Sequence, residues 1–385
     1  MKQPNTQHST PNTLPGIDVA QKQDFLPLHG RRIGLITNQT GLNRAGKPTP
    51  VLLRHAPGVL LHTLFSPEHG LRGMVDAAVP DALDSDVGLP VFSLYGERRQ
   101  PTTAQLQDLD TLVFDIQDIG TRYYTYISTL GLCMEAAAKH HLHFIALDRP
   151  NPIGGIAAEG PLPDRLGFTA YHSLPVRHGL TVGELARLFN AEKKLKLDLE
   201  VIPITGWKRG DLWDATGLKW TNPSPNMRSP LAALLYPGIG LLEGSNLSVG
   251  RGTASPFELV GADWIDGANL AHALNARMIP GVHFTDLRFT PTSSDYAGKS
   301  CGGVRIALTD TALFVPTFAG IAFAEVLRKL YPNAWEAAKL NDLLFHAASV
   351  KALLRGATAE EIVHRWSPDT ARFRERCKPF LLYPE

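Results

Sequence analysis

Short apolar runs alternate with segments of helical spacing along the first half of the chain. The runs are rich in aliphatic and aromatic residues and end at Gly, Pro or polar residues, which is the pattern of buried β-strands. They lie at residues 32–37, 59–65, 91–94, 111–116 and 142–147, with helical spacing at 48–55 and 126–141. Strands that are apolar throughout and separated by helices predict a Rossmann-like, doubly wound parallel sheet of the α/β class.

The pattern changes in the second half. A capping-box match at Thr181-Val182-Gly183-Glu184 predicts a helix to about Leu195, and residues 199–204 predict one more strand. Beyond these, strands and helices follow one another without regular alternation. The expected strands are 282–289 and 303–308, and the expected helices are 312–330 and several after residue 341. This mixture predicts a second domain of the α+β type.

We place the domain boundary near Gly206, so that residues 16–205 form the first domain and residues 206–385 the second. Residues 1–15 are polar and rich in Thr, Asn, Gln and Pro, which predicts a flexible leader. Residues 222–253 contain many Pro, Gly and Asn and are expected to be loop-rich. Long irregular segments inside compact proteins usually carry function.

The composition narrows the classes of protein. The chain has 385 residues, of which 44% are apolar and 19% charged, as in ordinary globular proteins of two domains. Its 38 Lys and Arg nearly balance 37 Asp and Glu, and no dense basic run occurs, so a nucleic-acid partner has no electrostatic support. Three scattered cysteines form neither a disulfide framework nor a metal-binding cluster.

The chain contains no apolar run near the ~20 residues that span a bilayer, so no membrane span is expected. Its first residues lack the basic start and apolar stretch of a signal peptide, which predicts a cytoplasmic protein. Export by another route and a mis-assigned start codon both stay open. No pattern in the sequence indicates an oligomeric state.

Polar residues follow the predicted strands of the first domain. All parallel strands of such a sheet point the same way, so residues after their carboxyl ends converge on one rim, where α/β proteins place their chemistry. These residues are Asn38, Glu68, His69, Asp115, Gln117, Asp118 and Asp148. Glu68 is the first candidate because Pro67 ends its strand and Gly70 lets the chain turn away. The alternative is that such residues only cap strands, which we favour for Asp148.

Asp115 and Asp118 are close in sequence, and neighbouring carboxylates can divide general acid and base roles. They could instead bind a divalent ion, although no established metal-ligand spacing supports that. Arg122-Tyr123-Tyr124-Thr125-Tyr126 follows directly. Its aromatic faces and hydroxyls suit a sugar ring, or they could pack the start of a helix.

A second polar motif runs from Glu243 to Thr253. Glu243, Asn246 and Arg251 supply an acid, an amide and a cation between glycines, although such glycines also serve plain turns. Gly298-Lys299-Ser300 lacks the preceding glycine of a phosphate-binding loop, and no G-x-G-x-x-G follows the first strand. We therefore expect no metal, nucleotide or other cofactor.

Five motifs in this order resemble one known family. They are residues 34–41, Ser66-Pro67-Glu68-His69-Gly70, residues 114–126, Asp148-Arg149-Pro150-Asn151-Pro152, and residues 243–253. The family is the bacterial exo-β-N-acetylmuramidases, long known as a domain of unknown function, and the resemblance covers residues 16–385. It implies an active site in the cleft between a Rossmann-like domain and a second domain. It also implies hydrolysis that releases N-acetylmuramic acid from the non-reducing ends of MurNAc-GlcNAc saccharides derived from peptidoglycan.

The resemblance places the family's acidic positions on Glu68 and Glu243. Glycoside hydrolysis needs a protonated acid and a second group near the anomeric carbon. Glu68 is the expected acid; Asp115, Asp118 or Glu243 could activate water or orient the substrate's acetamido group. Arg251, Arg72 and Arg122 are candidates for the lactyl carboxylate, with Arg251 preferred. Asn38, His69, Gln117, Tyr124 and Asn246 complete the expected binding residues. A non-catalytic sugar-binding protein and a metal-dependent hydrolase are the alternatives.

Overall fold

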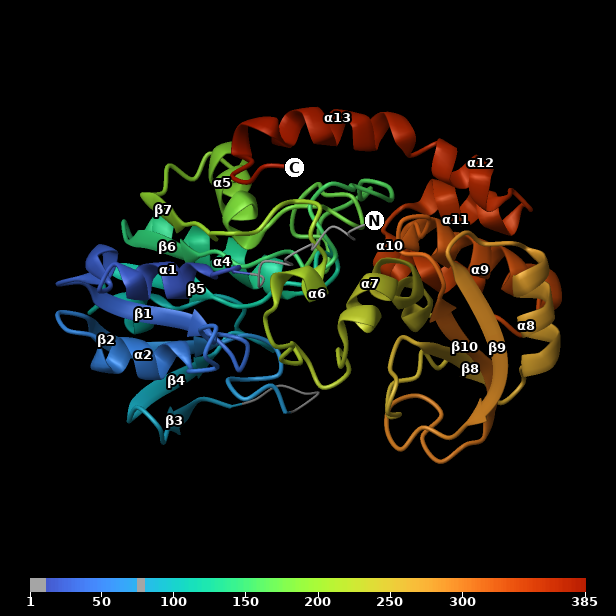
Figure 1. Ribbon diagram of the computed structural model, residues 1–385, viewed down its shortest axis with the longest axis horizontal. Helices are drawn as coiled ribbons and strands as arrows, with labels where there is room; N and C mark the ends of the chain where they lie inside the picture. Colours follow the sequence, from blue (N-terminus) through green and yellow to red (C-terminus); the bar gives the residue numbers. More distant parts are fainter. Residues whose placement is uncertain (1–11, 75–79) are drawn as a thin grey trace, which may run out of the picture.

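The described residues of the computed structural model, 12–74 and 80–385, contain two separate β-sheets (Figure 1). The first has seven strands in the order β3-β4-β2-β1-β5-β6-β7, parallel except for β3. The strands are β1 Arg32–Thr37, β2 Leu60–Ser66, β3 Ala82–Asp84, β4 Leu89–Ser93, β5 Thr111–Asp115, β6 His143–Leu147 and β7 Leu199–Ile202. The predicted doubly wound sheet is confirmed. The predicted leader lies mostly outside the described residues.

Helices cover both faces of this sheet, which explains why its strands are apolar throughout. The helices are α1 Gly16–Lys22, α2 Thr49–His55, α3 Thr103–Leu106, α4 Tyr126–Lys139 and α5 Val182–Glu192, with η1 Leu26–Leu28. Along β5, Val113 belongs to the core under α1 and α2, whereas Leu112 and Phe114 belong to the core with α4 and α5. Successive residues of a strand point to opposite faces, so one short run serves two cores.

The second half is built on a smaller antiparallel sheet in the order β8-β10-β9. Its strands are β8 Leu259–Ala262, β9 Val282–Phe289 and β10 Cys301–Leu308. Its helices are α6 Trp213–Thr216, α7 Pro230–Ile239, α8 Gly267–Ala276, α9 Pro316–Leu330, α10 Asn341–Leu344, α11 Ala347–Leu354, α12 Ala359–His364 and α13 Ser367–Cys377, with η2 Gly240–Gly244, η3 Ala337–Leu340 and η4 Lys378–Phe380. This arrangement confirms the predicted α+β character.

The expectation of a loop-rich segment at residues 222–253 is wrong for its middle, where α7 and η2 lie. Ser229 caps α7 by accepting a hydrogen bond from the backbone N–H of Ala232 at 2.9 Å. The glycine that suggested a loop serves packing instead. A Cβ atom on Gly238 would lie 1.9 Å from the carbonyl oxygen of Pro316, so only glycine lets α7 approach α9 this closely.

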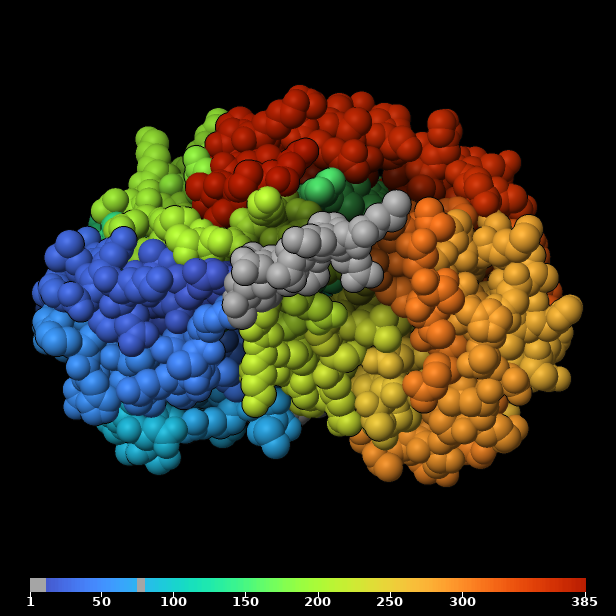
Figure 2. All heavy atoms as spheres, viewed as in Figure 1, coloured from blue at the N-terminus to red at the C-terminus, as the bar shows by residue number. Residues whose placement is uncertain are grey.

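The end of the chain returns to the first half. Helix α13 crosses the top of the molecule in Figure 1, and the red segment lies over both halves in Figure 2. The hydroxyl of Tyr383 donates to the buried carboxyl group of Asp148, and the backbone N–H of Leu382 donates to Glu184 Oε1 at 2.9 Å. Burial raises the pKa of Asp148 to about 6, against the lowering effect of its hydrogen-bond donors. The sequence favoured a structural role for Asp148, and its buried, hydrogen-bonded position agrees with that role.

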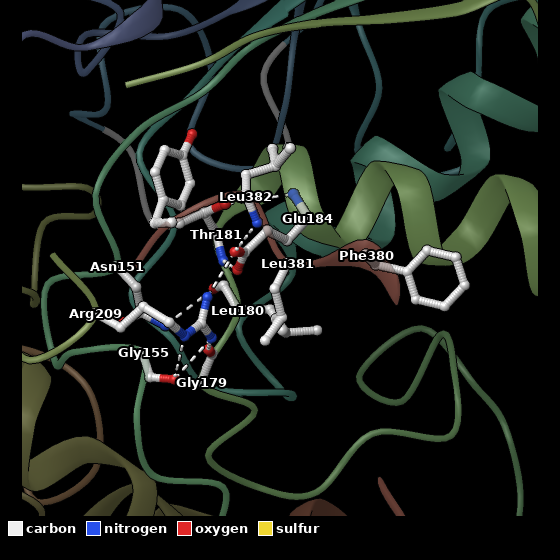
Figure 3. Close-up of polar contacts among 12 residues, drawn as sticks. Asn151, Gly155, Gly179, Leu180, Thr181, Glu184, Arg209, Phe380, Leu381 and Leu382 are labelled. Atoms are coloured by element: carbon white, nitrogen blue, oxygen red, sulfur yellow. Dashed lines mark hydrogen bonds and ion pairs between the residues drawn. The ribbon is translucent and has the colours of Figure 1, made fainter. Parts of the chain in front are cut away.

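Arg209 holds this junction together (Figure 3). Its guanidinium group donates to Glu184 Oε1 at 2.5 Å and to the carbonyl oxygens of Gly155 and Gly179, while its backbone N–H donates to the carbonyl oxygen of Pro384 at 2.9 Å. Residues on both sides of the expected boundary near Gly206 therefore pack together, and that boundary stays a prediction. No helix among the described residues combines the length and apolar character needed to cross a bilayer.

Candidate active site

A cavity of about 200 Å³ lies between the carboxyl ends of the first sheet's strands and the second half. It brings together five of the residues proposed from the sequence, namely Glu68, His69, Tyr124, Glu243 and Arg251. The first three come from the Rossmann-like half, and the last two come from the second half. The other residues in its wall are Tyr123, Thr125, Thr169, Ser224, Asn226, Met227, Tyr236, Phe257 and Leu343.

Glu68 reaches the cavity from the turn that follows β2. Strand β2 ends at Ser66, and His69 and Gly70 then adopt positive φ angles of 70° and 72°. Such angles reverse the chain within a few residues and leave the carboxylate of Glu68 at the rim of the sheet. The hydroxyl of Thr125, the residue before α4, donates to Glu68 Oε2 at 2.6 Å. The turn and this hydrogen bond together orient the carboxylate.

Glu243 and Arg251 form an ion pair in the wall contributed by the second half. Glu243 lies on η2, and Arg251 lies on the loop that follows. The flanking Gly250 and Gly252 have φ angles of 79° and 77°, which side-chain-bearing residues rarely adopt. The two glycines therefore hold the loop in the conformation that presents the Arg251 guanidinium to Glu243 and to the cavity.

Aromatic rings form the inner wall. The ring centroids of Tyr124 and Tyr236 are 6.0 Å apart, and those of Tyr236 and Phe257 are 4.7 Å apart. Burial raises the pKa of Tyr236, and the charge of Glu243 adds to the effect, so this phenol stays protonated. Both interpretations of the tyrosine motif apply, since Tyr123 and Tyr124 line the cavity while Tyr126, the first residue of α4, packs in the hydrophobic core.

Asp115 and Asp118 do not line this cavity. Asp115 is fully buried, accepting hydrogen bonds from Arg149 Nε at 2.6 Å and Nη2 at 2.9 Å and from the Thr49 hydroxyl at 2.5 Å. Asp118 Oδ2 accepts the backbone N–H of Gly120 at 2.7 Å. The two carboxylates thus have separate structural partners, and the geometry favours a scaffold role for both.

Two of the proposed arginines have other partners. Arg122 is completely buried and donates to four backbone carbonyl groups, those of Pro161, Leu174, Leu343 and Leu344. Its burial lowers its pKa to about 10. Arg72 pairs with Asp84 at 2.7 Å and with Asp86 at 2.8 Å. Neither guanidinium lines the cavity, which leaves Arg251 as the proposed arginine in its wall.

The side-chain amides of the three proposed binding residues, Asn246, Asn38 and Gln117, form hydrogen bonds with the backbone. Asn246 donates to the carbonyl oxygen of Ala334 at 2.8 Å and accepts from the backbone N–H of Glu336 at 2.8 Å. Asn38 Oδ1 accepts the backbone N–H of Thr40 at 2.9 Å, which forms a local turn. Gln117 donates to the carbonyl oxygen of Pro150 at 2.8 Å. None of the three lines the cavity.

Sequence reasoning missed several residues in the cavity wall. Thr125 lies inside the tyrosine motif, where a single threonine between two tyrosines gives no sequence signal of its own. Ser224 and Asn226 belong to the Pro- and Asn-rich segment that was expected to be functional as a whole. Tyr236 lies on α7, a helix that was not predicted because it contains Pro237 and Gly238. No group of three His, Cys, Asp or Glu side chains in residues 12–74 and 80–385 has the arrangement of a metal site.

Two family models cover nearly the whole chain. The model described as exo-β-N-acetylmuramidase NamZ, N-terminal, matches residues 33–231, and its C-terminal counterpart matches residues 234–383. The chain belongs to the NamZ exo-β-N-acetylmuramidase family. The resemblance drawn from the five motifs is therefore confirmed.

Three individual proteins are similar to this chain over nearly its whole length. The peptidoglycan β-N-acetylmuramidase NamZ of Bacillus subtilis is 40% identical over 380 residues, which is 97% of this chain and 92% of that protein. The crystal structures of two DUF1343 family proteins from Bacteroides fragilis are also similar. One has 36% identity and a TM-score of 0.90, covering 97% of this chain and 100% of that one. The other has 30% identity and a TM-score of 0.78, covering 97% and 99%.

Proposed function

We propose that the protein is an exo-acting glycoside hydrolase that releases N-acetylmuramic acid from the non-reducing ends of peptidoglycan fragments. The observation that carries the proposal is the match of both NamZ family models to consecutive parts of the chain, residues 33–231 and 234–383. Each half of this chain also places one glutamate in the same cavity. Incubation with the disaccharide MurNAc-GlcNAc tests it, with free N-acetylmuramic acid as the measured product. Binding of the disaccharide without turnover would instead indicate a sugar-binding protein.

Glu68 and Glu243 divide the catalytic work in this proposal. Cleavage requires a proton for the leaving oxygen and a second group near the anomeric carbon. Glu68, held by Thr125, is the proton donor. Glu243 is paired with Arg251 as a carboxylate, so it suits activation of water or orientation of the acetamido group. The scaffold partners of Asp115 and Asp118 make those residues weaker candidates for the second role.

The substrates in this proposal are MurNAc-GlcNAc saccharides derived from peptidoglycan, as expected for cell-wall turnover and recycling. The predicted cytoplasmic location stays part of the proposal. Fractionation of the source cells, with antibody detection of the protein, tests it.

Thr125→Val is expected to lower kcat on MurNAc-GlcNAc roughly 10- to 100-fold, since hydrogen bonds to charged groups contribute about 1.5–3 kcal/mol. Valine keeps the shape of threonine but removes the donor that orients Glu68. Thr125→Ser restores a hydroxyl and should recover most of kcat, with KM little changed in both variants. A serine variant as slow as the valine variant would show that the methyl group matters, not the hydrogen bond.

Arg251→Lys is expected to lose most of the preference for muramic-acid glycosides over N-acetylglucosaminides. Muramic acid carries an additional lactyl carboxylate, for which a guanidinium is a bidentate partner, and such a contact gives about one to two orders of magnitude in discrimination. A lysine supplies only a point charge. Comparing kcat/KM for the two sugars in wild type and variant measures the loss.

The pairing of Arg251 with Glu243 supports a different role, in which the arginine only braces its loop. If Arg251 only braces its loop, the Arg251→Lys protein should lose stability, or should lose activity on both sugars equally. Unchanged selectivity together with a lower melting temperature would therefore rule out recognition of the lactyl carboxylate by Arg251.

A further inference from the structure

A second, larger cavity of about 1040 Å³ adjoins the candidate active site. The two share a wall: Thr169 lines the active-site cavity, whereas the preceding Phe168 lines the larger one. The hydroxyl of Ser128 on α4 donates to the carbonyl oxygen of Phe168 at 2.5 Å and anchors this wall. Thr125, just before α4, lies in the first cavity and Lys139, at the end of α4, lies in the second. The larger cavity therefore begins beside the active site and follows α4 away from it.

We call this cavity the basic groove, because cations outnumber carboxylates in its wall. The cations are Arg98, Arg99, Lys139 and Lys193, and the carboxylates are Glu97 and Glu135. Arg98 pairs with Asp81 at 2.7 Å and Lys193 pairs with Glu135 at 2.8 Å. For Arg99 and Lys139, no carboxylate of the described residues lies within ion-pair distance. These two charges are therefore available to an anionic ligand.

Aromatic rings support two of the cations. The guanidinium carbon of Arg99 lies 4.1 Å from the ring centroid of Phe168, and the ammonium of Lys193 lies 4.3 Å from that of Tyr171. Stacking of this kind holds a cation in place while leaving its hydrogen-bond donors directed outward. A wall of stacked cations and ring edges suits a ligand that combines sugar rings with carboxylates.

We propose that the basic groove binds the glycan strand beyond the scissile bond through the free lactyl carboxylates of its muramic-acid residues. The inference rests on the proposed function. The active-site cavity, at about 200 Å³, is small, so a longer strand has to continue outside it. Helix α4 has 14 residues and extends about 20 Å at 1.5 Å per residue, which accommodates several sugars. A peptide-free strand presents a carboxylate on every second sugar, matching the excess of cations.

The double variant Arg99→Glu/Lys139→Glu tests the proposal. Its kcat/KM on peptide-free glycan strands is expected to fall roughly tenfold, since each reversal removes one exposed attraction and adds a repulsion. Its kcat/KM on the disaccharide MurNAc-GlcNAc should stay at the wild-type value. Lys351→Glu/Arg355→Glu, at the end of α11 and directly after it, makes the same change in net charge on exposed residues outside the groove and serves as the matched control.

An unchanged ratio of strand to disaccharide kcat/KM in the groove variant would overturn the proposal. So would a loss confined to intact peptidoglycan, whose lactyl groups are amide-linked, because the stem peptide would then be the ligand. Fluorescence anisotropy with labelled peptide-free strands measures binding without turnover. Weaker binding by the groove variant than by the control supports the groove even if the wild type releases no N-acetylmuramic acid, whereas equal binding by both variants overturns it.

Discussion

Glu68→Gln is expected to lower the release of N-acetylmuramic acid by about 10²–10⁴-fold, the usual contribution of a positioned proton donor. The amide keeps the shape of the carboxyl group and can still lie beside the Thr125 hydroxyl, so the turn after β2 should keep its conformation. The effect is expected on kcat rather than on KM, because the proton is needed only as the glycosidic bond breaks.

The measurement is kcat and KM on MurNAc-GlcNAc, whose leaving group is a sugar hydroxyl that needs protonation. Glu375→Gln on α13 is the matched control: it removes an exposed carboxylate far from the cavity in sequence and should leave kcat unchanged. Near wild-type turnover by the Glu68→Gln protein on this substrate would remove Glu68 from the role of general acid.

Asp115→Asn is expected to lower the free energy of unfolding by about 3–5 kcal/mol, the usual effect of removing one partner from a buried ion pair. The guanidinium of Arg149, itself buried, would lose the carboxylate that accepts its hydrogen bonds at 2.6 and 2.9 Å. Below the unfolding transition, kcat on MurNAc-GlcNAc should stay within a fewfold of wild type, since Asp115 lies outside the cavity wall.

Urea unfolding followed by circular dichroism measures the loss. Asp110→Asn is the comparison, because its pair with Arg32 is about half exposed and should be worth less than ~1 kcal/mol. If Asp115→Asn is too unstable to purify, Asp115→Asn/Arg149→Met removes the stranded charge and should recover stability. If the Asp115→Asn protein has wild-type stability but no activity, Asp115 is a catalytic residue after all.

The continuous apolar runs predicted the central strands β1, β5 and β6 of the first sheet, because both faces of these strands are buried. Strand β3 was not predicted, since its three residues Ala82–Asp84 form an exposed edge with no apolar run. Helix α7 was concealed by Pro237 and Gly238. Gly238 is needed there because α7 contacts α9, a helix about 80 residues further along the chain. Propensity within a short window carries no information about such a contact.

The same limit applies to the candidate site. The rule that strand ends converge on one rim correctly gathered polar residues, and Glu68 does line the cavity. The rule could not separate Glu68 from Asp115. Asp115 differs because it forms an ion pair with Arg149, which follows a different strand, and no strand pattern predicts that pairing. Glu243 and Arg251 were proposed from their motif and the family resemblance, since no strand pattern connects them to the rim.

The returning C-terminus bears on how the protein is made. The Rossmann-like half leaves the ribosome first, yet two of its buried carboxyl groups, those of Asp148 and Glu184, receive hydrogen bonds from Tyr383 and from the backbone of Leu382. These residues are synthesised about 180 residues after the last strand of the first sheet, β7, which ends at Ile202. The first half therefore reaches its final packing only once Leu382 and Tyr383 are in place, so a polypeptide interrupted before them lacks contacts of its first half as well as part of its second.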